Sequence, residues 1–101
     1  MLDRNLYSGL IRLHILHHAA EGPVFGQAMI DELGRHGYRM SAGTLYPILH
    51  GMERQGYLRS RLTLTGGRQR RVYRATAAGG KALVTARRRV QELFGEMFEQ
   101  D

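Results

Sequence analysis

The sequence has no cysteine and no tryptophan, and it contains only two prolines and one lysine among 101 residues. Without cysteine, a disulfide scaffold, a zinc–thiolate finger, an iron–sulfur site and a cysteine nucleophile are excluded. No stretch approaches the roughly 20 apolar residues of a membrane-spanning helix, and no N-terminal apolar run precedes a cleavage signal. We therefore expect one small cytoplasmic protein domain with no membrane partner.

Acidic residues are almost missing from the middle of the chain. Between Arg35 and Arg89 there are 13 basic residues and a single acid, Glu53, although the formal charge of the whole chain is only +6. A concentrated basic segment in a small domain favours a polyanionic partner, most often a nucleic acid. An arginine-rich surface that is merely solvated is the alternative.

Apolar residues at helical spacing predict two helices in the first third of the chain. Residues 2–20 carry Leu6, Leu10, Leu13 and Leu16 or His17 at helical spacing, and Asp3 or Asn5 is a suitable N-cap. The Glu-Gly-Pro run at 21–23 ends this helix. A second helix is predicted over residues 26–35, because apolar side chains recur there with the same period.

A third helix is predicted to begin at Ser41, which is a favourable N-cap residue. Its apolar positions follow at a spacing of three and four residues, and Gly56 supplies the stop. They are Leu45, Ile48, Leu49 and Met52. Pro47 removes one backbone donor and is expected to bend the first turns.

The period of the pattern changes after residue 57. Apolar and polar residues alternate over 58–64, residues 65–67 (Thr-Gly-Gly) are typical of a turn, and 70–75 predict a return strand. The result is a β-hairpin with arginines along both strands. They are Arg59, Arg61, Arg68, Arg70, Arg71 and Arg74.

A long helix is predicted from Thr76, its N-cap, to the end of the chain. Its apolar residues fall on heptad a and d positions, and the helix is longer than the rest of the chain needs as cover. The surplus apolar face favours a second copy of the chain as partner. The predicted dimer interface consists of Leu6, Leu10, Leu83, Ala86, Val90, Leu93, Phe94 and Met97.

Together these segments predict a mainly α fold with a small β-hairpin, a winged helix-turn-helix followed by a dimerisation helix. Residues 1–75 would form the DNA-binding domain. Residues 76–101 would form the dimerisation helix, in one compact unit with the N-terminal helix. In this arrangement the third helix enters a major groove and the hairpin arginines reach phosphates.

Two segments of the third helix region also carry a family resemblance. Residues 41–49 (SAGTLYPIL) and 52–58 (MERQGYL) resemble the recognition-helix signature of the PadR family of transcriptional regulators, and residues 70–79 are similar to its wing. The resemblance extends over residues 8–90 and fits the subfamily with one C-terminal helix. It implies a homodimeric repressor that binds a palindromic operator and responds to a small-molecule effector.

Eight polar or aromatic residues are the predicted contacts to DNA. Each has an alternative role in local capping, core packing or ion pairing. They are Ser41, Thr44, Tyr46, His50, Arg54, Arg68, Arg70 and Arg71. The resemblance also suggests an effector site between the first and last helices. Its candidate residues are Tyr7, His14, Phe94 and Phe98.

Three histidines lie close together on the first predicted helix. His14 is four residues from His18 and three from His17, a spacing that is compatible with metal binding. The glutamate and the third ligand of the usual motif are missing, so no metal site and no cofactor are predicted. A metal- or ligand-sensing protein that acts through protein contacts remains the alternative function.

No nucleophile motif, phosphate-binding loop or dinucleotide fingerprint is present, so we do not expect an enzyme.

Overall fold

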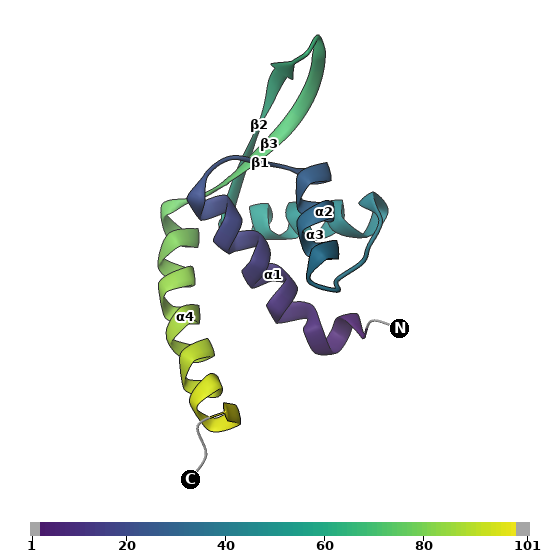
Figure 1. Ribbon diagram of the computed structural model, residues 1–101. Helices are drawn as coiled ribbons and strands as arrows, with labels where there is room; N and C mark the ends of the chain where they lie inside the picture. The colour runs from purple at the N-terminus through teal and green to yellow at the C-terminus, as the bar shows by residue number, and fades with distance from the viewer. Residues whose placement is uncertain (1–2, 99–101) are drawn as a thin grey trace.

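The computed structural model describes residues 3–98 of this protein (Figure 1). Helices and strands follow in the predicted order, with one additional strand. The elements are α1 (Arg4–Glu21), β1 (Val24–Phe25), α2 (Gly26–Arg35), α3 (Ala42–Arg54), β2 (Leu58–Thr65), β3 (Arg68–Ala75) and α4 (Ala77–Phe98). The predicted limits of the second helix agree with those of α2.

The core lies where the first three helices meet the base of the sheet. One face of α1 and the inner faces of α2 and α3 supply most of its side chains, and the sheet adds Leu58 and Tyr73. The largest fully buried side chains are Ile11, Ile15, Met29, Leu33, Leu45, Leu49 and Tyr73. This core fixes the angle between α2 and α3 and the origin of the hairpin.

The sheet has three antiparallel strands in the order β1-β3-β2. β2 and β3 form the predicted hairpin, which projects from the helices (Figure 1). The hairpin turns at Gly66 and Gly67, whose φ angles of 58° and 78° require glycine or a similarly permissive residue. β1 is the strand that the sequence did not reveal. Its two residues pair with the base of β3, through Val24 with Tyr73 and Phe25 with Val72.

α1 and α4 begin where the sequence places them. The Asp3 carboxylate accepts a hydrogen bond from the Leu6 amide at 3.1 Å, and the Thr76 hydroxyl accepts one from the Gly79 amide at 3.0 Å. Ser41 occupies the N-cap position of α3, but its side chain makes no capping hydrogen bond. Pro47 lies inside α3, which remains helical through Arg54.

Only the Leu16 end of the apolar stripe predicted for the first helix enters the core. The buried residues of α1 are Ile11, Ile15, Leu16 and Ala19, whereas Leu6 is 70% exposed and Leu10 is 44% exposed. The helix is apolar on two sides, and the core uses the side that carries the isoleucines. The leucine side lies partly along α4 and is otherwise uncovered.

Candidate nucleic-acid interface

α3 presents one side to the core and the opposite side to solvent. Leu45, Leu49 and Met52 are buried. On the other side, Gly43, Pro47, His50 and Arg54 are all exposed, and their spacing of four, three and four residues places them in one line along the helix. His50 and Arg54, predicted as DNA contacts, therefore point away from the core. Arg54 forms no ion pair with an acid within residues 3–98.

Thr44, on the edge of this exposed side, is held by Arg4, which is not among the predicted DNA contacts. Arg4, in the first turn of α1, donates a hydrogen bond from Nη1 to the Thr44 hydroxyl at 3.0 Å. The contact places an additional guanidinium beside the start of α3. Arg4 lies outside the basic middle segment of the chain, so neither charge nor periodicity pointed to it.

Tyr46 is half-buried and contacts the start of α2. Its ring and hydroxyl lie directly against the α-carbon of Gly26, at a position where any Cβ would overlap them. On its other side the ring lies 6.2 Å from the His50 ring, measured between centroids. Tyr46 thus connects α2 with the exposed side of α3.

The pairing of β2 with β3 sorts the hairpin arginines onto two faces. Residues paired across antiparallel strands point to the same side, and successive residues alternate. Arg59 pairs with Arg74, Arg61 with Val72, and Thr65 with Arg68. The outer face, opposite to buried Leu58 and Tyr73, therefore carries five arginines. They are Arg59, Arg61, Arg68, Arg70 and Arg74.

None of these five arginines makes an ion pair with an acidic residue in the described part of the chain. Arg59 and Arg74 are direct cross-strand neighbours, an arrangement that costs stability unless an anion binds there. The Arg70 guanidinium lies 4.3 Å from the centroid of the Phe25 ring, which fixes its position by a cation–π contact. The outer face is therefore positively charged, and Arg70 is the arginine on it whose position is fixed by a contact within the described chain.

Arg71 lies on the inner face of the hairpin, in a hydrogen-bonded network with α3. Its Nη1 donates to the Ser60 hydroxyl at 3.0 Å. The Ser60 amide in turn donates to Glu53 at 3.1 Å, and the Ser60 hydroxyl lies 2.9 Å from the same carboxylate. The one acid of the basic segment thus attaches the hairpin to α3. Of the three hairpin arginines predicted to contact DNA, Arg71 is the one with a partner of this kind.

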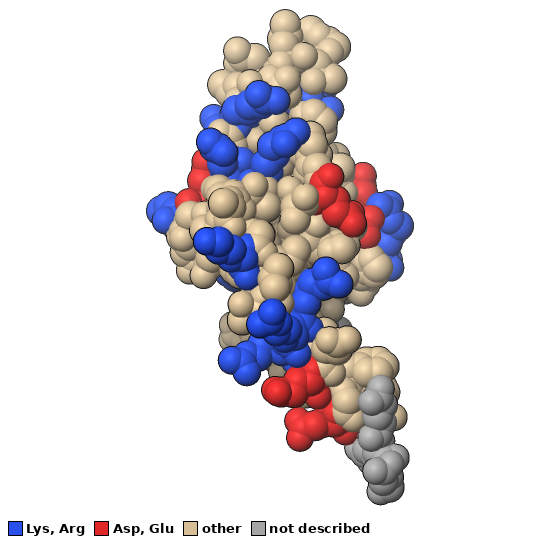
Figure 2. Space-filling model, turned by 90° about the vertical axis from the view of Figure 1, so that its left-hand side faces the viewer, with Lys and Arg blue, Asp and Glu red and all other residues tan. Residues whose placement is uncertain are grey.

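Basic side chains are frequent on the face of the molecule drawn in Figure 2. Figure 2 shows Lys and Arg side chains over the hairpin and down onto α4, and acidic side chains toward the lower end of α4. The basic residues of α4 are Lys81, Arg87, Arg88 and Arg89, and its described acids are Glu92 and Glu96. The positive potential is therefore strongest at the hairpin and the first half of α4.

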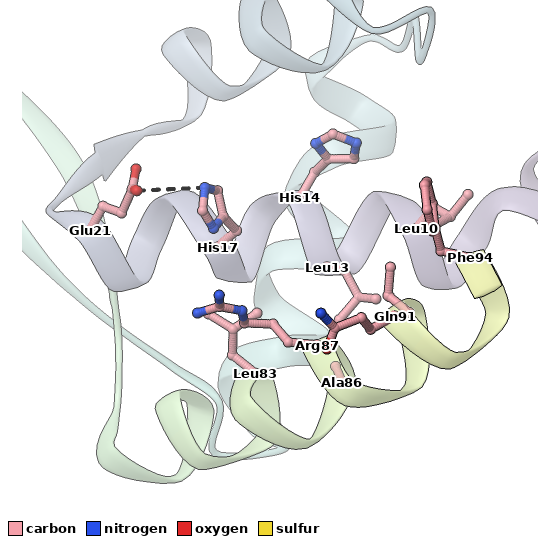
Figure 3. Close-up of a pocket in the computed structure, with 11 residues that line it drawn as sticks. Leu10, Leu13, His14, His17, Glu21, Leu83, Ala86, Arg87, Gln91 and Phe94 are labelled. Atoms are coloured by element: carbon pink, nitrogen blue, oxygen red, sulfur yellow. Dashed lines mark ion pairs between the residues drawn. The ribbon is translucent and has the colours of Figure 1, made fainter. Parts of the chain in front are cut away.

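A groove of about 780 Å³ separates α1 from α4 (Figure 3). The residues that line this groove include some from the predicted dimer interface and some from the predicted effector site. The lining consists of Leu10, Leu13, His14, His17, Glu21, Leu83, Ala86, Arg87, Val90, Gln91 and Phe94. Of the effector candidates, His14 and Phe94 line the groove and Tyr7 and Phe98 do not. The His14 ring points away from α4 and lies against the rings of His36 and Tyr38.

One side of the second half of α4 is apolar and uncovered. Only Gly79, near the start of this helix, is buried. Leu83 and Ala86 are half-buried, and the remaining α4 members of the predicted interface expose about half of their side-chain surface. These are Val90, Leu93, Phe94 and Met97. Leu6 and Leu10 of α1 are exposed at the same time, so of the predicted interface residues only Leu83 packs against the monomer core.

A helix pair with one uncovered helix, followed by an arginine-faced hairpin, defines the class of winged helix-turn-helix DNA-binding proteins. Residues 15–85 match the Transcriptional regulator PadR-like family. The chain belongs to this family, which confirms the resemblance and the fold class inferred from the sequence. Among residues 3–98, no helix combines the length and apolar character that crossing a membrane requires.

Known relatives agree with this assignment. The chain is 52% identical to Transcriptional regulator Rv3488 of Mycobacterium tuberculosis over 94 residues, which cover 93% of this chain and 88% of that protein. A PadR family regulator from Eggerthella lenta shares the fold with a TM-score of 0.77 and 30% identity, covering 96% of this chain and 88% of the other. Bacillus subtilis PadR, solved in complex with operator DNA, has the same fold with a TM-score of 0.67 and 19% identity, covering 75% of this chain and 45% of its own.

Proposed function

We propose that this transcriptional regulator is a homodimeric repressor that binds a specific palindromic operator and is released by a small-molecule effector. The observation that carries the proposal is the uncovered side of α3, with His50 and Arg54, beside a hairpin whose outer face holds five arginines without acidic partners. An α-helix fits the major groove, where side chains read base edges, and guanidinium groups bind phosphates.

The residues have different tasks in this proposal. His50 and Arg54 contact base edges or the adjacent backbone, because they lie on the outward side of α3. Ser41 and Thr44 are positioned for phosphates at the N-terminal end of α3, where the helix dipole favours an anion. Tyr46 orients His50 from the side. Arg68 and Arg70 bind backbone phosphates, and Arg71 mainly fixes the hairpin to α3.

The proposed partner of the apolar half of α4 is the same half of a second copy. A lone chain that exposes Val90, Leu93 and Met97 in one stripe has a patch that soluble monomers rarely leave open. A two-fold dimer would present two α3 helices about one turn of DNA apart, roughly 34–36 Å, which requires a palindromic site.

An effector in the α1–α4 groove would act by changing the angle between these helices. The groove volume of about 780 Å³ lies within the usual range for small-molecule sites. Because α4 is the proposed dimer element and α1 packs on the DNA-binding core, a change in their angle alters the distance between the two α3 helices. Repression then ends because the dimer no longer matches its operator.

The test is a mobility-shift titration of the purified chain on the DNA upstream of its own gene. We expect binding at about 150 mM salt, with at least about a thousandfold preference over a scrambled probe of equal composition. The double variant His50→Ala/Arg54→Ala should lose the preference and retain the nonspecific binding. Equal binding of wild type to both probes contradicts sequence-specific repression and favours the alternative, a sensor that acts through protein contacts.

A further inference from the structure

The last turns of α1 hold a group of side chains that the DNA-binding function does not use. One nitrogen of His17, one nitrogen of His18 and one carboxylate oxygen of Glu21 all lie within 4.8 Å of one another. His17 and Glu21 are four residues apart on one helix, a spacing that makes their side chains neighbours, and His18 follows His17 directly. His14, the other histidine of the predicted cluster, is not part of this group, because its ring lies against His36 and Tyr38.

The distances within the group suit a shared cation better than a hydrogen bond. The His17 Nε2 atom lies 3.6 Å from the Glu21 Oε2 atom, beyond the range of a protein hydrogen bond. Two ligand atoms that each lie about 2.0–2.1 Å from a tetrahedral zinc ion are separated by about 3.3–3.4 Å. His17 and Glu21 are exposed and His18 is half-buried, so rotation of the two exposed side chains would bring the ligand atoms toward one ion. Figure 3 shows His17 and Glu21 turned toward each other along α1.

His18 has the additional partner that metal-binding histidines usually have. Its Nε2 atom lies 3.4 Å from a carboxylate oxygen of Glu32, which extends from α2. Glu32 itself is held by Arg35 and His36. This contact is an ion pair and not a hydrogen bond, but a carboxylate beside one imidazole nitrogen still favours one ring orientation and leaves the other nitrogen for a metal ion. Glu32 thus acts as a positioning residue for His18 and connects the three proposed ligands to α2.

We propose that His17, His18 and Glu21 form a binding site for a divalent transition metal of the Zn²⁺ type. Two imidazole nitrogens and one carboxylate oxygen are a ligand set that such ions accept, whereas Mg²⁺ and Ca²⁺ prefer oxygen ligands alone. Three protein ligands leave one tetrahedral position for water or a further group. The sequence lacks the usual metal-binding motif, and only the structure brings Glu21, four residues after His17, beside both histidines.

The site also borders the groove between α1 and α4, because His17 and Glu21 line it. A bound ion would replace the negative charge of Glu21 with net positive charge opposite Arg87, another lining residue. Metal occupancy is therefore expected to influence what else enters the groove. The existence of the site does not depend on the proposed dimer or operator, and its test uses neither.

The experiment is isothermal titration calorimetry of ZnCl₂ into the full-length protein, after chelator treatment and removal of the chelator. We expect one Zn²⁺ per chain, and no binding when MgCl₂ replaces ZnCl₂. The variant His17→Gln/Glu21→Gln should bind Zn²⁺ at least about tenfold more weakly, and Glu32→Gln should weaken binding about 10- to 100-fold through His18. The matched control is His14→Gln, which removes a histidine from the same helix and should bind as wild type does.

The outcomes separate the proposed ligands from other histidines. Circular dichroism checks that each variant is folded, and Co²⁺ in place of Zn²⁺ gives a visible absorption band that reports tetrahedral coordination. A wild-type protein that binds no Zn²⁺ overturns the proposal. It is equally overturned when His17→Gln/Glu21→Gln binds as tightly as wild type, or when His14→Gln loses binding to the same degree as that variant.

Discussion

Two glycines of this chain are required because another residue lies directly against the α-carbon. At Gly26 the neighbour is the ring and hydroxyl of Tyr46. At Gly79 the neighbour is the backbone carbonyl of Tyr57, and the Leu16 side chain lies 3.2 Å from the place where a Cβ would be. The Tyr57 carbonyl also accepts a hydrogen bond from the Thr76 amide at 3.0 Å, so it has no freedom to move. The first turn of α4 therefore contacts the sheet through bare backbone.

We predict that Gly79→Ala destabilises the protein and that Gly80→Ala does not. A methyl group at position 79 overlaps a backbone carbonyl, so the free energy of unfolding should fall by about 1–3 kcal/mol. The neighbouring Gly80 has open space and lies in the same helix, so alanine there should raise the free energy of unfolding by about 0.5–1 kcal/mol. Urea denaturation midpoints measure both. Shifts of the same sign in the two variants would contradict the proposed contact.

A second prediction concerns the pH dependence of stability. The pKa of His14 is lowered because its ring is partly buried, and His36, His18 and His17 add to this effect while Glu32 opposes it. Glu32 itself stays ionised, since hydrogen bonds from Arg35 and His36 lower its pKa to about 2. A histidine with a folded-state pKa below its ordinary value of about 6.5 contributes stability above that value, and this contribution is lost as the pH falls below it.

Wild type should accordingly lose unfolding free energy between about pH 7.5 and pH 5.5, in chelator-containing buffer that removes any effect of metal. His14→Gln has no proton to take up at this position and should lose less over the same interval. Guanidinium unfolding at each pH measures the difference. Identical pH dependence of the two proteins would show that the environment of His14 does not govern this loss.

At the scale of the elements, the hairpin carries arginines on an outer face, which is free to bind DNA, and Arg71 on an inner face, which contacts α3 through Ser60. The two groups should therefore differ in their effect on DNA binding. Each phosphate contact contributes about 0.9 to the slope of log affinity against log salt. Arg68→Ala and Arg70→Ala should each reduce that slope by about this amount, because both side chains lie on the outer face. Arg71→Ala should change the slope less, since its guanidinium binds Ser60 on the inner face.

Arg12→Ala is the matched control for charge. Arg12 is exposed on α1 and donates hydrogen bonds to Ser8 of the same helix, away from the hairpin. Its removal lowers the net charge of the protein as much as any hairpin variant does. Fluorescence anisotropy with labelled operator DNA over a range of salt concentrations provides the slopes. If Arg12→Ala reduced the slope as much as Arg68→Ala, net charge rather than hairpin contact would determine binding.

Some structural features of these elements depend only on neighbouring residues, and the sequence predicts those features. Asp3, Thr76 and the Gly66–Gly67 turn act within a few residues of their own position, and the sequence was sufficient to locate them. β1 has only two residues, too few for an alternating pattern, and exists because β3 pairs with it. Periodicity likewise established that α1 is a helix but not which of its two apolar sides faces the core.

The candidate site also contains residues whose position the sequence predicts and contacts that only the tertiary fold creates. The outward position of His50 and Arg54 follows from the helical period together with the buried leucines of α3. The contact between Arg4 and Thr44 joins residues 40 positions apart, and the bond between Arg71 and Ser60 bridges the hairpin next to Glu53. Such contacts arise from the tertiary fold, so neither composition nor spacing predicts them. Glu21 was visible in the sequence, but only the structure placed it beside both histidines.

The whole molecule is elongated, with extents of 57 × 33 × 21 Å, because α4 and the hairpin extend in opposite directions from the core (Figure 1). The hairpin end is basic, and the far end of α4 is apolar with acids beside it (Figure 2). An isolated chain of this size has a modest core, and the apolar half of α4 adds nothing to it. In the proposed dimer that half becomes a second core shared by two chains, with the basic surfaces at both outer ends.

The prediction at this scale is that Val90→Asp separates the dimer and Val84→Asp leaves it intact. Val90 lies in the stripe with Leu83, Ala86, Leu93 and Met97, whereas Val84 is similarly exposed on another side of the same helix. Burying an unpaired carboxylate in an apolar interface is strongly unfavourable, but on a solvated side the same substitution changes little. Light scattering coupled to gel filtration should give the 11.5 kDa monomer mass for Val90→Asp and twice that mass for wild type and Val84→Asp.

Val90→Asp should also lose operator binding, since a single half-site cannot hold the protein at physiological salt. A wild-type mass equal to that of the monomer, or an unchanged mass for Val90→Asp, would refute the role of this stripe in dimerisation.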